Sequence, residues 1–226
     1  MGKLFEQQEQ IKQIVLHQLK AHWLDVDEQI IEAALPAALK AVEVGFYGNP
    51  SRRFFDGEEV LFSPYNSVQW MVFLYRLSRE IHVKNPGAKE ADQVYYLNKI
   101  MHANDWLYAV DLPLHFLCEH ALGCVLGRAK YGDYLFAYQG TTVGGNWNNG
   151  VLCYPTLGDN VTLFANSTVL GDTRIGNNVL ISADTYIINE DIPDNCIVFG
   201  RSPNITIRPM EEEKIKQYTQ HIWGWK

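Results

Sequence analysis

Long apolar runs and positive charge are both scarce in this sequence. The apolar run at 71–75 falls far short of the roughly eighteen residues that a bilayer-spanning helix needs. Charged residues make up only 20% of the chain, and the net charge of −7 is the opposite of the basic excess that nucleic-acid binding usually requires. We therefore expect neither a membrane nor a nucleic acid as a partner.

Cysteine is also scarce, and its spacing is irregular. The four cysteines lie at positions 118, 124, 153 and 196. This spacing does not suggest a disulfide framework, and the polar first twelve residues contain no apolar signal-peptide core, so reduced thiols and a cytoplasmic location are expected. No metal site is predicted either, because the nearest histidine pair, His115 and His120, lacks an obvious third ligand.

What the sequence does contain is a six-residue repeat between positions 157 and 192. Apolar residues recur every six positions from Leu157 to Ile187, and the unit LGDNV at 157–161 returns as IGNNV at 175–179. A helix has a period of about 3.6 and a strand a period of about 2, so neither fits alone. Short strands separated by corners fit, and the Gly, Asp and Asn residues between the apolar positions tolerate turns. The repeat predicts a parallel β-helix of the hexapeptide type.

The six-residue spacing extends upstream of the clear repeats. It runs through positions 106, 112, 118 and 124. It resumes at Tyr131 after a one-residue slip and fails between Val143 and Leu157, where GGNWNNGVLCYP is typical of a loop leaving the coils. Loops on a rigid scaffold commonly carry function. The β-helix is therefore expected to begin near residue 105.

Helical patterns occupy the rest of the chain. Apolar spacing predicts helices over about residues 4–24, 27–44, 64–83 and 92–103. A bend is expected near Pro36 and a long loop over 45–63, and the run EEEKIKQYTQHIW predicts a closing helix over the open end of the β-helix. The expected fold class is α+β, with a helical domain, a β-helix and a C-terminal cap. Their expected ranges are 1–104, 105–205 and 206–226.

Four motifs, taken in order, resemble those of serine O-acetyltransferases and related hexapeptide-repeat acyltransferases. They are EHALGCVLG at 119–127, YQGTTVGG at 138–145, the coils over 157–187, and DIPDNCIVFGRSPN at 191–204. The resemblance implies a left-handed β-helix, which is an exception to the usual right-handed crossover. It also implies a homotrimer or a dimer of trimers, with acetyl-CoA lying along the coils between neighbouring subunits.

The resemblance assigns roles to individual residues. His120 matches the general base that takes the proton of the acceptor hydroxyl during direct acetyl transfer without a metal. Glu119 matches an acid that contacts the acceptor. Five positions match residues near acetyl-CoA: Gly144, Gly145, Ala183, Gly200 and Arg201. The glycine pair would allow the thioester to approach backbone amides closely.

The aspartate that orients His120 is left open between two residues. Asp105 lies fifteen residues before His120, which is the family's own spacing, whereas Asp111 lies in VDLP, which looks like the family's VDIHP. On a coil of eighteen residues, a residue fifteen positions back lies almost beneath the histidine. The spacing therefore favours Asp105.

One departure from the family affects the acceptor. Where the family has Arg-His-Pro to hold an amino-acid carboxylate, this chain has Cys153, Tyr154 and Pro155, and neither of the first two is a cation. Tyr154 and Glu119, with Glu59 from the loop over 45–63, are the candidate substrate-binding residues. The expected acceptor is a small hydroxyl compound, either serine or a sugar.

Two functions remain in view. The first is an acetyl-CoA-dependent O-acetyltransferase with His120 as its base. The second is a catalytically silent β-helix that serves as a scaffold for assembly. Release of free thiol from acetyl-CoA in the presence of an acceptor distinguishes them.

Overall fold

The computed structural model describes residues 3–225, and the chain divides into two compact units. The first unit holds the residues up to Ala103 together with Leu107–Ala109, and the second holds Asn104–Trp106 and the residues from Val110 onward. Among the described residues, no helix has both the length and the apolarity required to cross a membrane.

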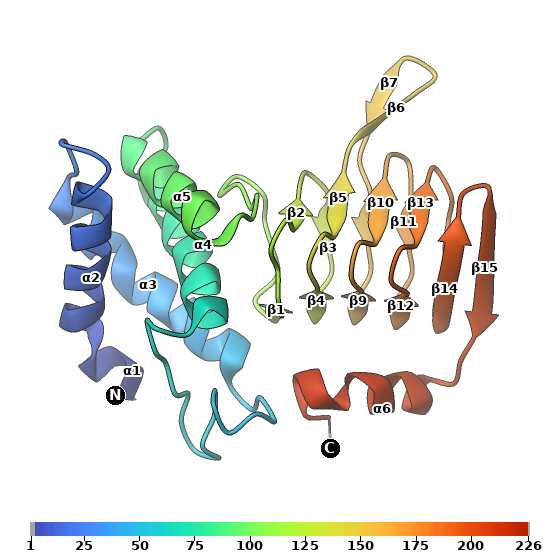
Figure 1. Cartoon of the computed structure of the whole chain (residues 1–226), viewed down its shortest axis with the longest axis horizontal. Helices are drawn as coiled ribbons and strands as arrows, with labels where there is room; N and C mark the ends of the chain where they lie inside the picture. Colours follow the sequence, from blue (N-terminus) through green and yellow to red (C-terminus); the bar gives the residue numbers. More distant parts are fainter. Residues whose placement is uncertain (1–2, 226) are drawn as a thin grey trace. The chain divides into compact units, whose positions relative to one another are not determined.

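The first unit is α-helical, as predicted (Figure 1). Its helices are α1 (Lys3–Glu6), α2 (Gln8–Lys20), α3 (Glu28–Phe46), α4 (Ser67–Lys84) and α5 (Lys89–His102). Helix α4 packs against both α3 and α5, and its apolar side chains, among them Trp70, Phe73 and Leu77, are buried. The core of this unit therefore lies around α4.

Several helix boundaries differ from the prediction. The expected first helix is broken at Gln7 and ends at Lys20, and nothing in the sequence pattern explains the break. Helix α4 starts at Ser67 rather than near residue 64, because the Asn66 side chain caps it by accepting hydrogen bonds from two backbone amides, at 3.1 and 3.2 Å. Helix α5 starts earlier than expected, and Glu90 and Asp92 in its first turn favour that start.

The second unit is a parallel β-helix followed by a short helix, so the expected fold class is confirmed (Figure 1). Its coils have three faces. Face A consists of β1 (Phe116–Cys118), β4 (Leu135–Ala137), β9 (Val161–Leu163), β12 (Val179–Ile181) and β14 (Cys196–Arg201). Face B consists of β2 (Val125–Leu126), β5 (Thr142–Gly144), β10 (Thr168–Leu170) and β13 (Tyr186–Ile188). Face C consists of β3 (Lys130–Tyr131), β8 (Thr156–Leu157) and β11 (Arg174–Ile175).

Buried side chains form a column behind each face. On face A the aligned inward residues are Cys118, Ala137, Leu163, Ile181 and Val198, each 3% exposed or less. On face B they are Leu126, Val143, Val169 and Ile187, each fully buried. Burying one such aliphatic side chain contributes about 1.5 to 3 kcal/mol, so these columns are the main source of stability in the coils.

The outward side of face A is mostly apolar and buried as well, with Thr162 as the buried polar member of the column. Leu117, Phe136 and Leu180 alternate with the inward residues, yet they are 5% exposed or less. On face C the outward residues Lys130 and Arg174 are exposed. Face A must therefore be covered by another element.

Helix α6 (Glu212–Trp223) provides this cover, which corrects the prediction that it closes the open end. Figure 1 shows α6 running across the strands of face A, along the stack of coils, and its Trp223 ring lies 6.3 Å from that of Phe136 in β4. The buried side of α6 carries Ile215, Thr219 and Ile222. The open end is bounded instead by β15 (Asn204–Pro209), which pairs antiparallel with β14. The apolar outward side of face A is the physical reason for this placement.

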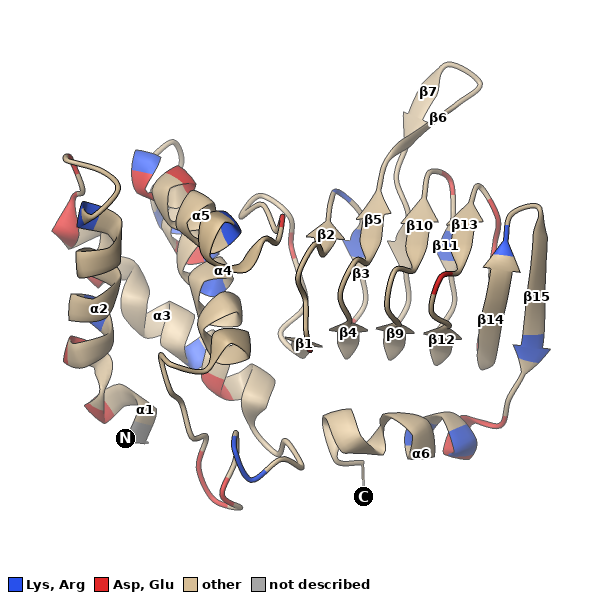
Figure 2. Cartoon of the chain, viewed as in Figure 1, with Lys and Arg blue, Asp and Glu red and all other residues tan. Residues whose placement is uncertain are grey.

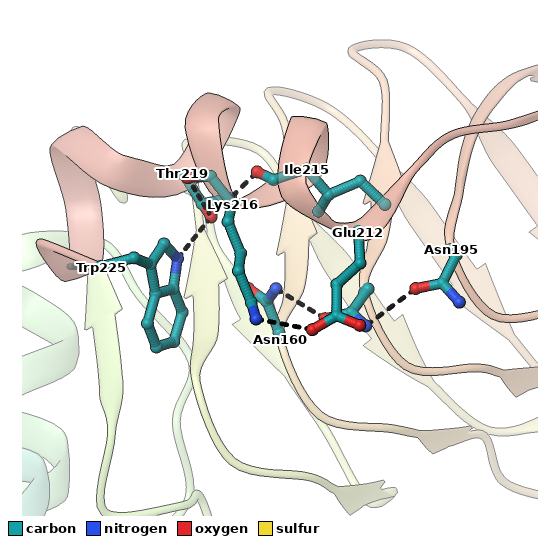
Figure 3. A network of polar contacts seen from close by, with 8 residues as sticks. Asn160, Asn195, Glu212, Ile215, Lys216, Thr219 and Trp225 are labelled. Atoms are coloured by element: carbon teal, nitrogen blue, oxygen red, sulfur yellow. Dashed lines mark hydrogen bonds and ion pairs between the residues drawn. The ribbon is translucent and has the colours of Figure 1, made fainter.

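The corner between faces C and A carries a ladder of asparagines. Asn160, Asn178 and Asn195 occupy equivalent positions with φ near 55°, and their side-chain amides hydrogen-bond in series at 2.9 Å (Figure 3). Tyr134 holds the equivalent position one coil earlier, with φ 58°. It interrupts the ladder, and the buried Oδ1 of Asn160 is left without a partner among the described protein atoms.

Tyr134 replaces the ladder with an aromatic cluster. Its ring stacks on His115 at 4.4 Å and contacts Trp223 at 5.3 Å and Trp225 at 4.8 Å. The Trp225 indole donates to the Thr219 hydroxyl at 2.8 Å (Figure 3). The C-terminal end of α6 is therefore anchored at the interruption of the ladder.

This anchor predicts the effect of removing the Trp223 ring. Trp223→Ala should lower the free energy of unfolding by about 2 to 3 kcal/mol, less than for a fully buried aromatic because Trp223 is half-buried. Hydrogen exchange of the α6 amides should become faster at the same time. Tyr218→Ala, at an exposed position of the same helix, is the control and should change neither. Unchanged exchange in Trp223→Ala would contradict the proposed anchor.

Candidate active site

His120 lies on an enlarged corner between faces A and B. The corner spans 119–124 in its coil, whereas the equivalent corner of the next coil spans only 138–141. Two extra residues therefore leave the regular coil here. Because a parallel ladder cannot absorb an insertion within a strand, the extra residues extend away from the coils at the corner.

The backbone of His120 is in the left-handed region, at φ 52°. In the described β-helix, every other non-glycine residue with such a φ, apart from Tyr134, is Asn or Asp. Asn, Asp and His adopt this conformation more often than other non-glycine residues, but it still costs on the order of 1 kcal/mol. The side chain is exposed, and the Leu122 amide donates to the His120 carbonyl at 2.6 Å. Strain of this kind concentrates at functional sites.

Successive coils place several candidate residues on one edge of the prism, which we call the A–B edge. The residues two positions past each inward residue of face A are His120, Gln139, Ala165, Ala183 and Gly200. The candidate base thus shares an edge with two of the residues expected near acetyl-CoA. Coils are spaced by about 4.8 Å, so four coils separate His120 from Gly200 by about 19 Å.

Charged groups are sparse along the strands of the β-helix (Figure 2). Arg201 ends β14, directly after Gly200, and its guanidinium lies over the Tyr186 ring at 4.7 Å. This cation–π contact holds an exposed positive charge at the far end of the A–B edge. Gly200 has φ 93°, and a Cβ there would lie 2.9 Å from the Asn204 carbonyl oxygen, so only glycine fits.

The sequence did not identify Tyr138 as part of this region. Glu119 and Tyr138 both lie one position past an inward residue of face A, on adjacent coils, and the Glu119 amide donates to the Ala137 carbonyl at 3.2 Å. Burial raises the pKa of Tyr138, and the nearby negative charge of Glu119 raises it further. Counting one coil forward from Glu119 would have found Tyr138, had the length of that coil been known.

Asp105 is brought to the A–B side of the prism, but not directly beneath His120. It bridges to Val125, with Asp105 N donating to Cys124 O at 2.9 Å. The coil thus takes twenty residues, from 105 to 125, and the expected eighteen-residue register is wrong here because of the enlarged corner. Val125 ends the corner that carries His120. Asp111 is exposed. It comes six residues after Asp105, which bridges to Val125 on face B, so the chain has left that face when it reaches Asp111.

Gly145 and Tyr154 meet at the other end of face B. Gly144 ends β5, and a Cβ on Gly145 would lie 2.8 Å from Cε1 of Tyr154, so this glycine makes room for the ring. Between Gly145 and Tyr154, β6 (Asn146–Asn148) and β7 (Val151–Cys153) form a hairpin that projects from the coils (Figure 1). We call this hairpin the arm. Trp147 on this arm is 68% exposed.

The candidate residues therefore fall into three groups. His120 and Glu119 share the A–B edge with Ala183, Gly200 and Arg201. Gly144, Gly145 and Tyr154 lie at the opposite end of face B, about 10 Å away by the length of three strand residues. Glu59 lies in the first unit, where its amide donates to the Asp56 carboxylate at 2.8 Å.

The repeats match a known family of hexapeptide proteins. The family model described as bacterial transferase hexapeptide (six repeats) matches residues 154–189. The serine acetyltransferase of Synechococcus elongatus is 41% identical over 83 residues, which are 36% of this chain and 34% of that protein. That of Staphylococcus xylosus is 36% identical over 83 residues, 36% of this chain and 38% of that protein. These matches cover only about a third of each relative's length.

Solved structures extend the likeness to the whole fold. The serine acetyltransferase of Neisseria gonorrhoeae superposes with a TM-score of 0.65 at 22% identity, over 84% of this chain and 74% of that one. The enzyme of Brucella abortus gives a TM-score of 0.63 at 20% identity, over 81% and 73%. The sequence matches confirm the resemblance to serine acetyltransferases that the motifs predicted. At these identities the structural likeness concerns the fold.

The cysteines yield a prediction on reactivity. All four are free; Cys118, Cys124 and Cys196 are buried, and only Cys153 is half-exposed, on the arm. Burial raises the pKa of Cys124 to about 12 and that of Cys196 to about 11, so neither forms the reactive thiolate near neutral pH. One thiol per native chain should react with a chromogenic disulfide reagent at pH 8. Four should react after denaturation, and Cys153→Ser should abolish the native reaction. Rapid native labelling of Cys118 or Cys124 would contradict the burial.

Proposed function

We propose that this chain is an acetyl-CoA-dependent O-acetyltransferase that transfers acetyl directly to a hydroxyl of a small acceptor. The observation that carries the proposal is His120, held at a strained and enlarged corner at the start of the A–B edge. The motif resemblance and the likeness to serine acetyltransferases support it. The four free cysteines favour a reducing, cytoplasmic location.

In the proposed reaction His120 is the general base. It takes the proton of the acceptor hydroxyl while the acceptor oxygen attacks the thioester carbonyl carbon. The carbon–sulfur bond then breaks, the proton passes from the imidazolium to the leaving thiolate, and the products are an acetyl ester and free CoA. Backbone amides around Gly144 and Gly145 stabilise the oxyanion. This mechanism uses no metal.

Acetyl-CoA is placed along the A–B edge. Ala183 and Gly200 have little or no side chain, so they leave the edge open to an extended ligand of about 19 Å. Arg201 at its far end supplies a cation for the phosphates. Acetyl-CoA can therefore lie along the A–B edge, with its thioester next to His120 and its phosphates near Arg201.

A homotrimer, or a dimer of trimers, is part of this proposal. Within one chain, face B separates His120 from the glycine pair and Tyr154, so a single thioester cannot reach both groups. The same corner of a neighbouring copy can face His120 across the groove between two prisms. The site is therefore shared between copies.

The acceptor is proposed to be a sugar-like alcohol rather than free serine. Cys153 and Tyr154 provide no cation for a carboxylate, whereas an arginine clamp would contribute a bidentate, charge-assisted contact. Tyr154 and the exposed Trp147 on the adjoining arm suit the hydroxyls and the apolar face of a sugar. Arg128, exposed after β2 at the end of face B that carries Gly145, is the alternative source of a cation.

Thiol release tests the function and the acceptor together. The protein is mixed with acetyl-CoA and either L-serine or a panel of amino- and deoxy-sugars, free and nucleotide-linked. We expect turnover with a sugar, and His120→Ala should lower kcat by about 10² to 10⁴. Leu122→Ala, exposed on the same corner, is the control and should retain activity.

The outcomes of this assay are distinct. A serine KM below the millimolar range without sugar turnover would overturn the acceptor assignment. Turnover in a correctly assembled His120→Ala protein would overturn the mechanism. No release with any acceptor would favour a scaffold.

The orienting aspartate is tested by a paired substitution. Asp105→Asn should lower kcat more than Asp111→Asn, because Asp105 bridges to Val125 at the end of the His120 corner while Asp111 lies beyond face B. Both changes keep the size of the side chain, so circular dichroism should show that both variants fold. The reverse order of the two kcat losses would assign the role to Asp111.

A further inference from the structure

The last coil of the β-helix turns the A–B edge in fewer residues than the coil before it. Strand β14 pairs with β12 up to Val198 and with β13 at Arg201. Only Phe199 and Gly200 lie between these two positions, whereas four residues, 182–185, form the corner one coil earlier. Gly200 makes the turn with φ 93°. Phe199 therefore lies on face A and Arg201 on face B, on either side of Gly200.

Each side of this corner carries an arginine whose guanidinium lies over an aromatic ring. On face B, the guanidinium carbon of Arg201 lies 4.7 Å from the centroid of the Tyr186 ring. On face A, that of Arg208 lies 5.4 Å from the centroid of the Phe199 ring. Arg208 belongs to β15, the antiparallel strand that bounds the open end of the β-helix. Gly200 is thus flanked by two cations.

Both guanidiniums remain available to a ligand. Arg201 and Arg208 are exposed, and neither forms an ion pair with a carboxylate in the described part of the chain. A cation–π contact uses the flat face of the guanidinium, so the N–H donors in its plane stay free. The contact also restricts the side chain, so less conformational entropy is lost when a ligand binds. Two ordered cations in a chain of net charge −7 favour a ligand with two anionic groups.

We propose that Arg208 is a second phosphate-binding residue of the acetyl-donor site and that it selects CoA by its 3′-phosphate. Arg201 directly follows Gly200 on the A–B edge, where the proposed donor brings its pyrophosphate. Arg208 lies on the face A side of the same corner, where the 3′-phosphate can branch away from the extended chain of the donor. A guanidinium can bind such a phosphate through two parallel hydrogen bonds.

This inference rests on the proposed acetyl transfer and adds the selection of the donor. CoA carries its 3′-phosphate on the ribose of its nucleotide. A phosphopantetheine thioester on a carrier protein has neither the nucleotide nor the second phosphate group, so it leaves Arg208 without a partner. The site is therefore assigned to CoA thioesters rather than to carrier-bound ones.

The test compares acetyl-CoA with acetyl-3′-dephospho-CoA as donors for the full-length protein. In Arg208→Gln the KM for acetyl-CoA should rise about tenfold, the usual effect of losing one hydrogen bond to a charged group. The KM for the dephospho donor should stay within about twofold. Arg201→Gln should raise both KM values, because both donors contain the pyrophosphate. Arg174→Gln, exposed on face C, is the matched control and should change neither.

Binding of free CoA gives a second readout that needs no turnover. In calorimetric titrations the unmodified protein should bind CoA about tenfold more tightly than 3′-dephospho-CoA. Arg208→Gln should abolish this preference by weakening only the binding of CoA. Arg208→Lys keeps the positive charge and should restore most of the preference.

Equal affinity of the unmodified protein for CoA and 3′-dephospho-CoA would overturn the inference. So would Arg208→Gln if it weakened both ligands by the same factor. Because these titrations contain no acceptor, the expected preference for CoA in a protein that acetylates nothing would support the phosphate site while the proposed function fails. Acetyl transfer with equal KM values for the two donors would leave the proposed function standing and overturn the role of Arg208.

Discussion

Register between successive coils is the constraint on which the rest of the β-helix depends. Each strand hydrogen-bonds to the strand one coil away, and a slip of one residue would exchange the buried and exposed sides of a face. Extra residues can leave the coils only at corners. The two insertions into the regular coil, the enlarged corner at 119–124 and the arm at 146–153, lie at the two ends of face B, and the candidate site residues gather there.

The same constraint explains the position of the C-terminal helix. Face A is mostly apolar on both sides, so its outward side must be covered, and α6 lies along it instead of closing the open end. The asparagine ladder at the C–A corner stops where Tyr134 replaces asparagine. The lost amide contact is offset by an aromatic cluster that anchors Trp223 and Trp225.

The candidate site combines features that the likeness to serine acetyltransferases accounts for with features that set this chain apart. His120 on its strained corner and the small residues along the A–B edge agree with the shared motifs. Two phenols set this chain apart: Tyr138 lies one coil from Glu119 on the A–B edge, and Tyr154 packs against Gly145 at the opposite end of face B. The proposed difference in acceptor follows from these side chains.

The sequence by itself determined the β-helix, because a six-residue period is a local property that each corner repeats without reference to distant residues. It also determined the helical first unit and the ordered motifs that carry the resemblance. Three features were decided only by the tertiary structure: the twenty-residue coil at Asp105, the stacking of Tyr138 on Phe164 one coil away, and the placement of α6 on face A. Each depends on how insertions are distributed among corners and on which distant surface remains uncovered. Neither the distribution of insertions nor the uncovered surface can be predicted from a short segment of the sequence.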